Sequence, residues 1–488
     1  MTDAIKTSLR DSKSARWTAL IIVAFTMFGA YFFNYALSPL KPMLENMLAW
    51  NSTDFGTYTS SYGWLNVFLF MLIFSGIILD KFGIRFTGIA STFTMAIGTG
   101  INYWAIVHTF PEGSFIFGIK TQVIISAIGF SIFGVGTEAA GITVSKAIVK
   151  WFKGYEMALA MGMQMSIARL GTALALGICL PLAKNFSYAS PVLLSFVFML
   201  IGVTAFIIYT ILDKKLDASE KEQEMELEED EFHPRDILDI IKNKGFWYIA
   251  ILCVLFYGAV FPFLFYATDL MINKYNVSPN LAGTIPALLP FGTIFLTPLF
   301  GTVYDKKGKG ATIMLIGAIM LIFVHGLLAI PVLSVWWIAT LLVIILGIAF
   351  SLVPAAMWPS VPKIIPEKQL GTAYAVIFWI QNIGLLGIPL LLGLILNATN
   401  PSVVPNKTMM KDAFIKAYTE VITTKNIQLS KQDINKLAID INSDLIDDII
   451  QTTNYTVTDD DQINSADVTN SPGIILNFSP FHSHSFCL

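Results

Sequence analysis

Two stretches of this sequence share one pattern. They read Gly76-Ile-Ile-Leu-Asp80-Lys81-Phe-Gly83-Ile-Arg85 and Gly301-Thr-Val-Tyr-Asp305-Lys306-Lys307-Gly308-Lys309. Both contain G-x-x-x-D-K-x-G followed within two residues by a basic residue, and their aspartates lie 225 residues apart. The glycines permit a tight turn between two closely packed helices, and the aspartate can face the positive N-terminal end of a neighbouring helix. The pattern therefore predicts two halves of similar structure, each with a turn between two helices at the equivalent place.

The composition indicates a membrane protein. The chain has 488 residues, of which 55% are hydrophobic and only 13% are charged, whereas soluble globular proteins have about 25% charged residues. Its mean hydropathy is +0.66. The formal net charge of −3 provides no basic surface for nucleic acid, and three cysteines are too few for a disulfide scaffold. We predict an all-α protein that crosses the membrane several times.

No catalytic or cofactor motif is found in the sequence. It has no G-x-x-x-x-G-K-[ST] loop to bind ATP phosphates and no His/Cys/Asp cluster with metal-ligand spacing. It also has no Ser-His-Asp arrangement suited to nucleophilic catalysis. We therefore expect neither an enzyme nor a bound metal or cofactor.

Eleven apolar runs are long enough to span a membrane, which takes about 20 residues. The predicted spans are 17–38, 56–79, 86–108, 119–149, 155–183, 189–212, 245–273, 279–304, 311–330, 334–357 and 370–396. With the N-terminus in the cytoplasm, the loops outside the cytoplasm up to residue 396 hold only four basic residues, Lys41, Lys120, Lys184 and Lys274. Because Lys and Arg concentrate in cytoplasmic loops, we predict a cytoplasmic N-terminus.

The spans predict four regions along the chain. Residues 1–212 form an N-terminal six-helix bundle, 213–244 an acidic cytoplasmic linker, and 245–396 a C-terminal bundle with five detectable spans. The remaining 397–488 is polar and holds no apolar run long enough for a twelfth span. We expect it to be an extracytoplasmic tail or insertion.

The repeated loop resembles the signature of the major facilitator superfamily. This resemblance implies two six-helix bundles, a substrate site between them near the midplane, and alternating access by a rocker-switch movement. It also implies gating roles for Asp80, Arg85 and Asp305. The sequence departs from the family pattern in the twelfth helix, which is missing from the predicted spans.

Two charged residues lie deep in the predicted spans. A charge at the bilayer centre costs roughly 2.5–3.5 kcal/mol on insertion scales, so each needs a reason. Glu138 lies about 18 Å along span four from Lys150, and Arg169 about 22 Å along span five from Gly154. At this similar depth they could form a structural ion pair, although buried pairs stabilise poorly. The functional interpretation is that they bind the ammonium and the carboxylate of a zwitterion.

The residues around these charges resemble a narrower group. Trp151-Phe-Lys-Gly154 followed by Gly162-Met-Gln-Met-Ser-Ile-Ala-Arg169-Leu-Gly171 is similar to the major facilitator superfamily domain-containing protein 1 group of lysosomal dipeptide transporters. The resemblance implies uniport of dipeptides, with Glu138 and Arg169 holding the two ends of the peptide. It further implies an accessory membrane protein as a partner, beside membrane lipid and the small-molecule substrate.

The weaker candidates for substrate binding are polar or aromatic residues inside the spans, where an amide needs a hydrogen-bond partner. They are Asn34, Tyr35, Tyr257, Trp379 and Gln381, with further ones at Tyr31, Trp64, Asn66, Tyr266, Trp358 and Asn382. Each of these residue types more often serves packing or hydrogen bonding between helices than ligand binding.

Two alternatives to dipeptide transport remain open from the sequence. Arg169 alone could bind the substrate of an organic-anion exchanger or symporter, or the bundle could anchor a non-transporting sensor or scaffold. Uniport is favoured because an arginine beside Glu138, the one deep acid, would disfavour its protonation. The expected location is the plasma (inner) membrane, with a lysosomal membrane implied by the resemblance.

Overall fold

The computed structural model describes residues 8–111, 113–152, 154–220, 240–365 and 370–401. The chain divides into two compact units, formed by Met1–Lys41 with Ser52–Ile395 and by Pro42–Asn51 with Leu396–Leu488. The first unit contains every residue predicted to bind substrate. Residues 402–488, most of the predicted tail, lie outside the described residues.

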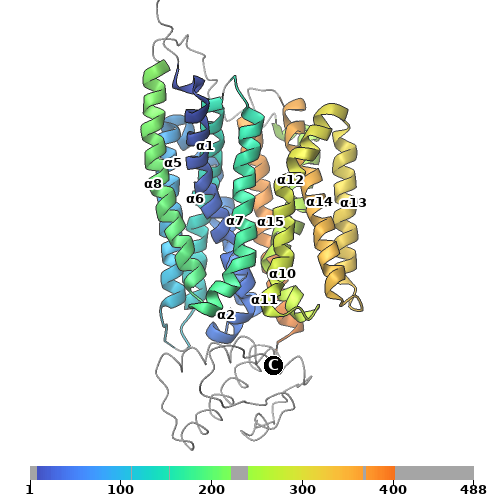
Figure 1. Cartoon of the computed structure of the whole chain (residues 1–488). Coiled ribbons are helices and arrows are strands. Elements are labelled where there is room, and N and C mark those ends of the chain that lie inside the picture. Colours follow the sequence, from blue (N-terminus) through green and yellow to red (C-terminus); the bar gives the residue numbers. More distant parts are fainter. Residues whose placement is uncertain (1–7, 112, 153, 221–239, 366–369, 402–488) are drawn as a thin grey trace, which may run out of the picture. The chain divides into compact units, whose positions relative to one another are not determined.

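The N-terminal half, taken as the described residues up to 220, consists of long helices joined by short ones and one small hairpin (Figure 1). Its elements are η1 (Leu9–Asp11), α1 (Lys13–Ala36), η2 (Ser38–Leu40), α2 (Lys41–Leu48), α3 (Ser52–Ser60), η3 (Ser61–Gly63), α4 (Trp64–Phe68), α5 (Met71–Val107), β1 (Phe115–Ile116), β2 (Ile119–Lys120), α6 (Thr121–Phe152), α7 (Met157–Asn185) and α8 (Ser190–Glu220). The two strands are antiparallel, with Phe115 opposite Lys120.

The C-terminal half, taken as the described residues from 240 onward, is also helical. Its elements are α10 (Lys244–Asn273), α11 (Pro279–Ala282), α12 (Thr284–Lys307), α13 (Gly310–Ala329), α14 (Trp336–Ser360), η4 (Val361–Lys363) and α15 (Leu370–Thr399). Helix α7 of the N-terminal half packs against α12 of the C-terminal half. The all-α prediction is therefore confirmed for the described part of the chain.

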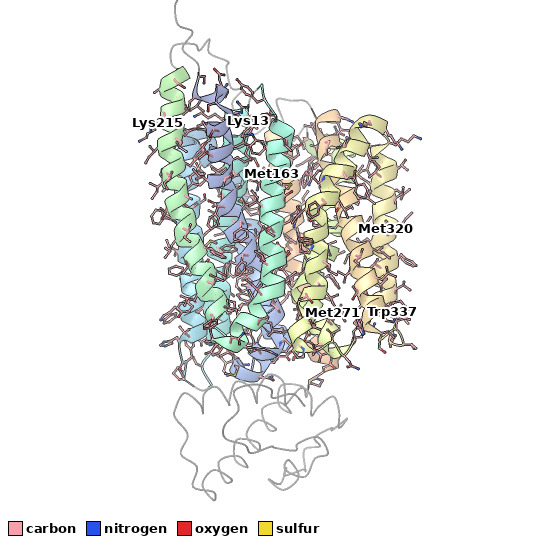
Figure 2. All side chains as sticks on the ribbon, viewed as in Figure 1. Lys13, Met163, Lys215, Met271, Met320 and Trp337 are labelled. Atoms are coloured by element: carbon pink, nitrogen blue, oxygen red, sulfur yellow. The ribbon has the colours of Figure 1, made fainter. Side chains whose placement is uncertain are left out.

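Nine described helices are long and apolar enough to cross a membrane, or ten if the bent pair 52–68 and 71–79 is counted as one span. The predicted third span, 86–108, corresponds to the helical second half of α5. The total of eleven and the cytoplasmic N-terminus stay predictions. Figure 2 shows Lys13 and Lys215 at one end of the helices and Met271 and Trp337 at the other, the arrangement that the predicted orientation requires.

The repeated loop has the same backbone feature in both halves. Gly83 breaks α5 with φ +75° and ψ +175°, and Gly308 follows α12 with φ +65°. A glycine reaches positive φ without the steric cost that a Cβ imposes. The second glycine of each copy is therefore the residue that turns the chain between two helices, as the repeat predicts.

The start of the predicted linker 213–244 is helical, and the limits of the linker stay a prediction. Helix α8 continues to Glu220, so the first part of that segment is helical. Asp213 has only 2% of its side chain exposed and receives hydrogen bonds from Arg85 of α5 (2.7 Å) and Lys150 of α6 (3.0 Å). These cations hold the end of α8 against its neighbours, which the acidic composition alone did not indicate.

Candidate substrate-binding site

Glu138 lies near the middle of α6, at a place where α6 and α5 approach closely. A Cβ added to Gly136 would lie 2.7 Å from the Ser91 carbonyl oxygen of α5, so only glycine fits there. The Tyr62 hydroxyl donates a hydrogen bond to Oε1 of Glu138 at 3.0 Å. The side chain of Asn382 on α15 lies close to Glu138. Neutral polar groups of both halves of the chain thus border the carboxylate.

Arg169 lies near the middle of α7, where a second glycine permits close packing. A Cβ on Gly171 would lie 2.3 Å from the Phe28 carbonyl oxygen of α1. The Arg169 guanidinium carbon is 4.8 Å from the centroid of the Phe350 ring and 5.4 Å from those of Tyr31 and Phe261. Cations are attracted to the faces of aromatic rings. Rings from α1, α10 and α14 therefore surround the guanidinium.

The guanidinium has an unused donor. Nη1 of Arg169 is buried and has no hydrogen-bond partner, and no acidic side chain in the described segments lies within 4.0 Å of it. An uncompensated buried donor normally costs about 1–3 kcal/mol, and more when charged. This cost is removed when a ligand carboxylate accepts the hydrogen bond.

The ion pair between Glu138 and Arg169, one of the two alternatives raised by the sequence, is absent from the structure. Glu138 accepts a hydrogen bond from Tyr62 and lies close to Asn382, and Arg169 lies among aromatic rings. Both charges lie near the middle of their helices, α6 and α7, but the position along two helices does not determine which way their side chains face. Arg169 forms no ion pair with Glu138 that would keep this carboxylate ionised, so the reason for uniport drawn from the sequence loses its support.

Three residues that contact the two charges were not among the candidates from the sequence. They are Tyr62, Phe261 and Phe350. A phenylalanine in a membrane span carries no signal that distinguishes a ring facing a cation from one facing lipid.

The weaker candidates lie in two kinds of environment. Tyr257 borders the aromatic group around Arg169: its ring centroid is 5.1 Å from that of Phe261, and its hydroxyl accepts a hydrogen bond from Trp358 Nε1 at 3.1 Å. Asn34 and Tyr35 lie on α1, and their buried Oδ1 and hydroxyl have no partner. The Tyr35 ring stacks on Phe265 at 4.9 Å.

Trp379 and Gln381 use their polar groups in contacts between helices. Trp379 Nε1 donates to the Val67 carbonyl oxygen at 3.1 Å, and Gln381 Oε1 accepts from Cys253 Sγ at 3.3 Å. Their predicted role in substrate binding stays a prediction.

Of the three predicted gating residues, only Arg85 has a described side chain. Arg85 forms ion pairs with Asp213 at 2.7 Å and with Asp217, both on α8 of its own half. The side chains of Asp80 and Asp305 lie outside the described residues. The gating roles of all three stay predictions. Within the described segments no group of three His, Cys, Asp or Glu residues could hold a metal ion.

The chain belongs to the major facilitator superfamily of transporters. The family model, described as Major Facilitator Superfamily, matches residues 23–389. Its members are transporters and not enzymes, so the protein crosses the membrane several times and carries a small-molecule substrate. The plasma-membrane location expected by default finds no support, since its curated relatives are lysosomal.

Among its relatives, the chain is similar to the lysosomal dipeptide transporter MFSD1. It is 30% identical to the human protein over 394 residues, which cover 78% of this chain and 80% of the relative. The bovine protein is 29% identical over 393 residues, with the same coverage. The predicted resemblance to this group is confirmed.

Solved structures support the fold. A bacterial homologue of the human lysosomal transporter Spinster, in an inward-facing and occupied conformation, matches with a TM-score of 0.58 and 16% identity, covering 83% of this chain and 86% of that chain. A D-xylose–proton symporter matches with a TM-score of 0.59 and 13% identity, covering 77% and 89%. At these identities the match concerns the fold alone.

Proposed function

We propose that the protein transports dipeptides, with Arg169 binding the carboxylate and Glu138 the ammonium of the peptide. The observation that carries the proposal is the unpartnered Nη1 of Arg169, a fixed cationic donor buried in the middle of a membrane helix. A carboxylate is the ligand that a guanidinium binds most strongly, through paired hydrogen bonds. The curated relatives with similar sequence are dipeptide transporters.

The separation of the two charges supports a zwitterion and not a simple anion. Because Glu138 and Arg169 do not neutralise each other, each is available to a ligand group of opposite sign. A monocarboxylate would leave the Glu138 carboxylate without a cation and would be repelled by it. This disfavours the organic-anion alternative.

The contacts across the two halves support alternating access. Glu138 of α6 lies close to Asn382 of α15, and Arg169 of α7 lies against rings of α10 and α14. A rocker-switch movement of one half against the other changes the surroundings of both charges. We propose that this movement exposes the site to the two sides of the membrane in turn.

Uniport, the lysosomal membrane and an accessory protein remain parts of the proposal. They follow from the resemblance to the lysosomal relatives. For uniport, the test is uptake of a dipeptide into liposomes with and without an imposed pH gradient. Uptake that follows the substrate gradient alone supports uniport, and uptake that requires the proton gradient overturns it.

The substrate site is tested by uptake of a labelled dipeptide into liposomes that contain the purified protein. We expect Arg169→Ala and Glu138→Gln to abolish saturable uptake while the purified yield and melting temperature stay near those of the wild type. Lys215→Ala, which removes an exposed cation at the end of α8, is the matched control and should transport normally. Normal uptake by Arg169→Ala contradicts the proposal.

A further inference from the structure

Tyr31 lies on α1 between the two charges of the proposed site. Helix α1 packs against both α6, which carries Glu138, and α7, which carries Arg169. The Arg169 guanidinium is 5.4 Å from the Tyr31 ring centroid. Both the carboxylate and the guanidinium act electrostatically on the Tyr31 hydroxyl.

Neighbouring tyrosines show that this position is particular to Tyr31. Of the two charges, Tyr35 interacts electrostatically with Arg169 and Tyr62 with Glu138. Tyr31 interacts with both. Of the three tyrosines, Tyr31 alone is thus within electrostatic reach of both ends of the site.

The Tyr31 hydroxyl is free to bind a ligand. The Tyr62 hydroxyl donates to Glu138, and the Tyr35 hydroxyl is fully buried. Tyr31, in contrast, is partly exposed, and within the described segments its hydroxyl has no hydrogen-bond partner and is not one of the fully buried unpaired atoms. A phenol can both donate and accept a hydrogen bond.

We propose that Tyr31 is a further substrate-binding residue, whose hydroxyl hydrogen bonds to the peptide group between the two charged ends of the ligand. This inference rests on the proposed function, because it presupposes that Glu138 and Arg169 hold those ends. Its consequence is selectivity: a zwitterion with an amide in the middle binds more tightly than one of the same length without it. A site that hydrogen bonds to a ligand group discriminates against a ligand that lacks the group.

The test compares two ligands of equal length. Glycylglycine has a peptide group between its ends, and 5-aminopentanoate has two methylene groups in its place. Dissociation constants of both are measured by calorimetry with the purified full-length wild type and Tyr31→Phe. Tyr248→Phe is the matched control, because Tyr248 is 74% exposed on α10 and its loss removes the same hydroxyl elsewhere.

We expect Tyr31→Phe to raise the dissociation constant of glycylglycine by about 3- to 10-fold, which is the usual contribution of a neutral hydrogen bond. The dissociation constant of 5-aminopentanoate should stay within about twofold of the wild-type value. Tyr248→Phe should change neither. Equal weakening of both ligands, or no weakening of glycylglycine, overturns the role of Tyr31. The melting temperature of Tyr31→Phe, which retains the ring beside Arg169, shows whether the variant is folded.

The same calorimetry separates this inference from the proposed function. If Glu138→Gln and Arg169→Ala bind glycylglycine as the wild type does, the proposed function fails. If those two variants lose binding and Tyr31→Phe shows no loss specific to the peptide group, only the inference about Tyr31 fails.

Discussion

Arg85 and Arg169 are both arginines of membrane helices, but their surroundings differ. Arg85, at the end of the bundle, forms ion pairs with Asp213 and Asp217, and these aspartates also pair with Lys150. Arg169, in the middle of its helix, is surrounded by aromatic rings and keeps a buried donor without a partner. A charge that serves the fold is compensated within the protein, whereas a charge that serves a ligand is left for the ligand to compensate.

The largest effect should come from truncating the two arginines. Arg169→Ala should weaken dipeptide binding by about 100-fold or more, because it removes a pair of charge-assisted hydrogen bonds, with little loss of thermal stability. Arg85→Ala should lower the melting temperature and change the dissociation constant far less than Arg169→Ala does. Calorimetry and thermal unfolding of both variants measure this contrast. The contrast is contradicted if both variants lose dipeptide binding and thermal stability to the same extent.

A second effect concerns Asp213, the buried aspartate that pairs with Arg85 and Lys150 near the end of α8. The Asp213 side chain is 2% exposed and contacts two cations. Asp213→Ala should reduce the free energy of unfolding by about 3 kcal/mol, because Arg85 and Lys150 each lose a charge-assisted hydrogen bond and keep only Asp217 as a partner. Lys214→Ala, on the exposed face of the same helix turn, is the control and should have almost no effect. A stable Asp213→Ala variant would show that the cluster does not hold α8.

A smaller effect is expected at the ion pair that joins the two halves. Lys41 Nζ lies 2.8 Å from Asp269 Oδ2, with side chains 4% and 12% exposed. Lys41→Ala and Asp269→Ala should each lower the free energy of unfolding by about 2 kcal/mol. Exchanging the residues in Lys41→Asp with Asp269→Lys should recover part of this loss. If the double exchange loses as much free energy of unfolding as the two alanine changes together, the contact between Lys41 and Asp269 does not stabilise the protein.

The smallest effect is a pH dependence at the turn between α6 and α7. A hydrogen bond from its own backbone N–H, together with the Arg16 guanidinium at 3.2 Å, lowers the pKa of Glu156. A carboxyl with a lowered pKa adds stability above its unfolded pKa and loses it as the pH falls through the folded value. The melting temperature of Glu156→Gln should therefore be below that of the wild type at pH 7, and the difference should shrink at acidic pH. A constant difference contradicts this assignment.

Sequence patterns predicted the parts of this molecule that depend on one helix at a time. Apolar runs located the helices, and the glycines of the repeated loop, Gly83 and Gly308, turn the chain as expected. The cost of charge in a membrane singled out Glu138 and Arg169.

Those sequence patterns could not predict which side chains meet between helices. The rings of Phe261 and Phe350 reach Arg169 from helices far along the chain, and their residue type is common in every span. The same limit explains why an ion pair between Glu138 and Arg169 stayed an alternative: the position along a helix is readable from sequence, but the facing direction depends on packing by other helices.

The most direct test of the central claim is to block each end of the ligand in turn. Thermal stabilisation of the purified protein, which rises with ligand binding, is measured for a dipeptide, its N-acetylated form and its C-terminal amide. The wild type should respond only to the free dipeptide. Arg169→Ala should no longer distinguish the acid from the amide, and Glu138→Gln should no longer distinguish the free from the acetylated amine. If each variant keeps the discrimination of the wild type, Glu138 and Arg169 do not hold the ends of the substrate.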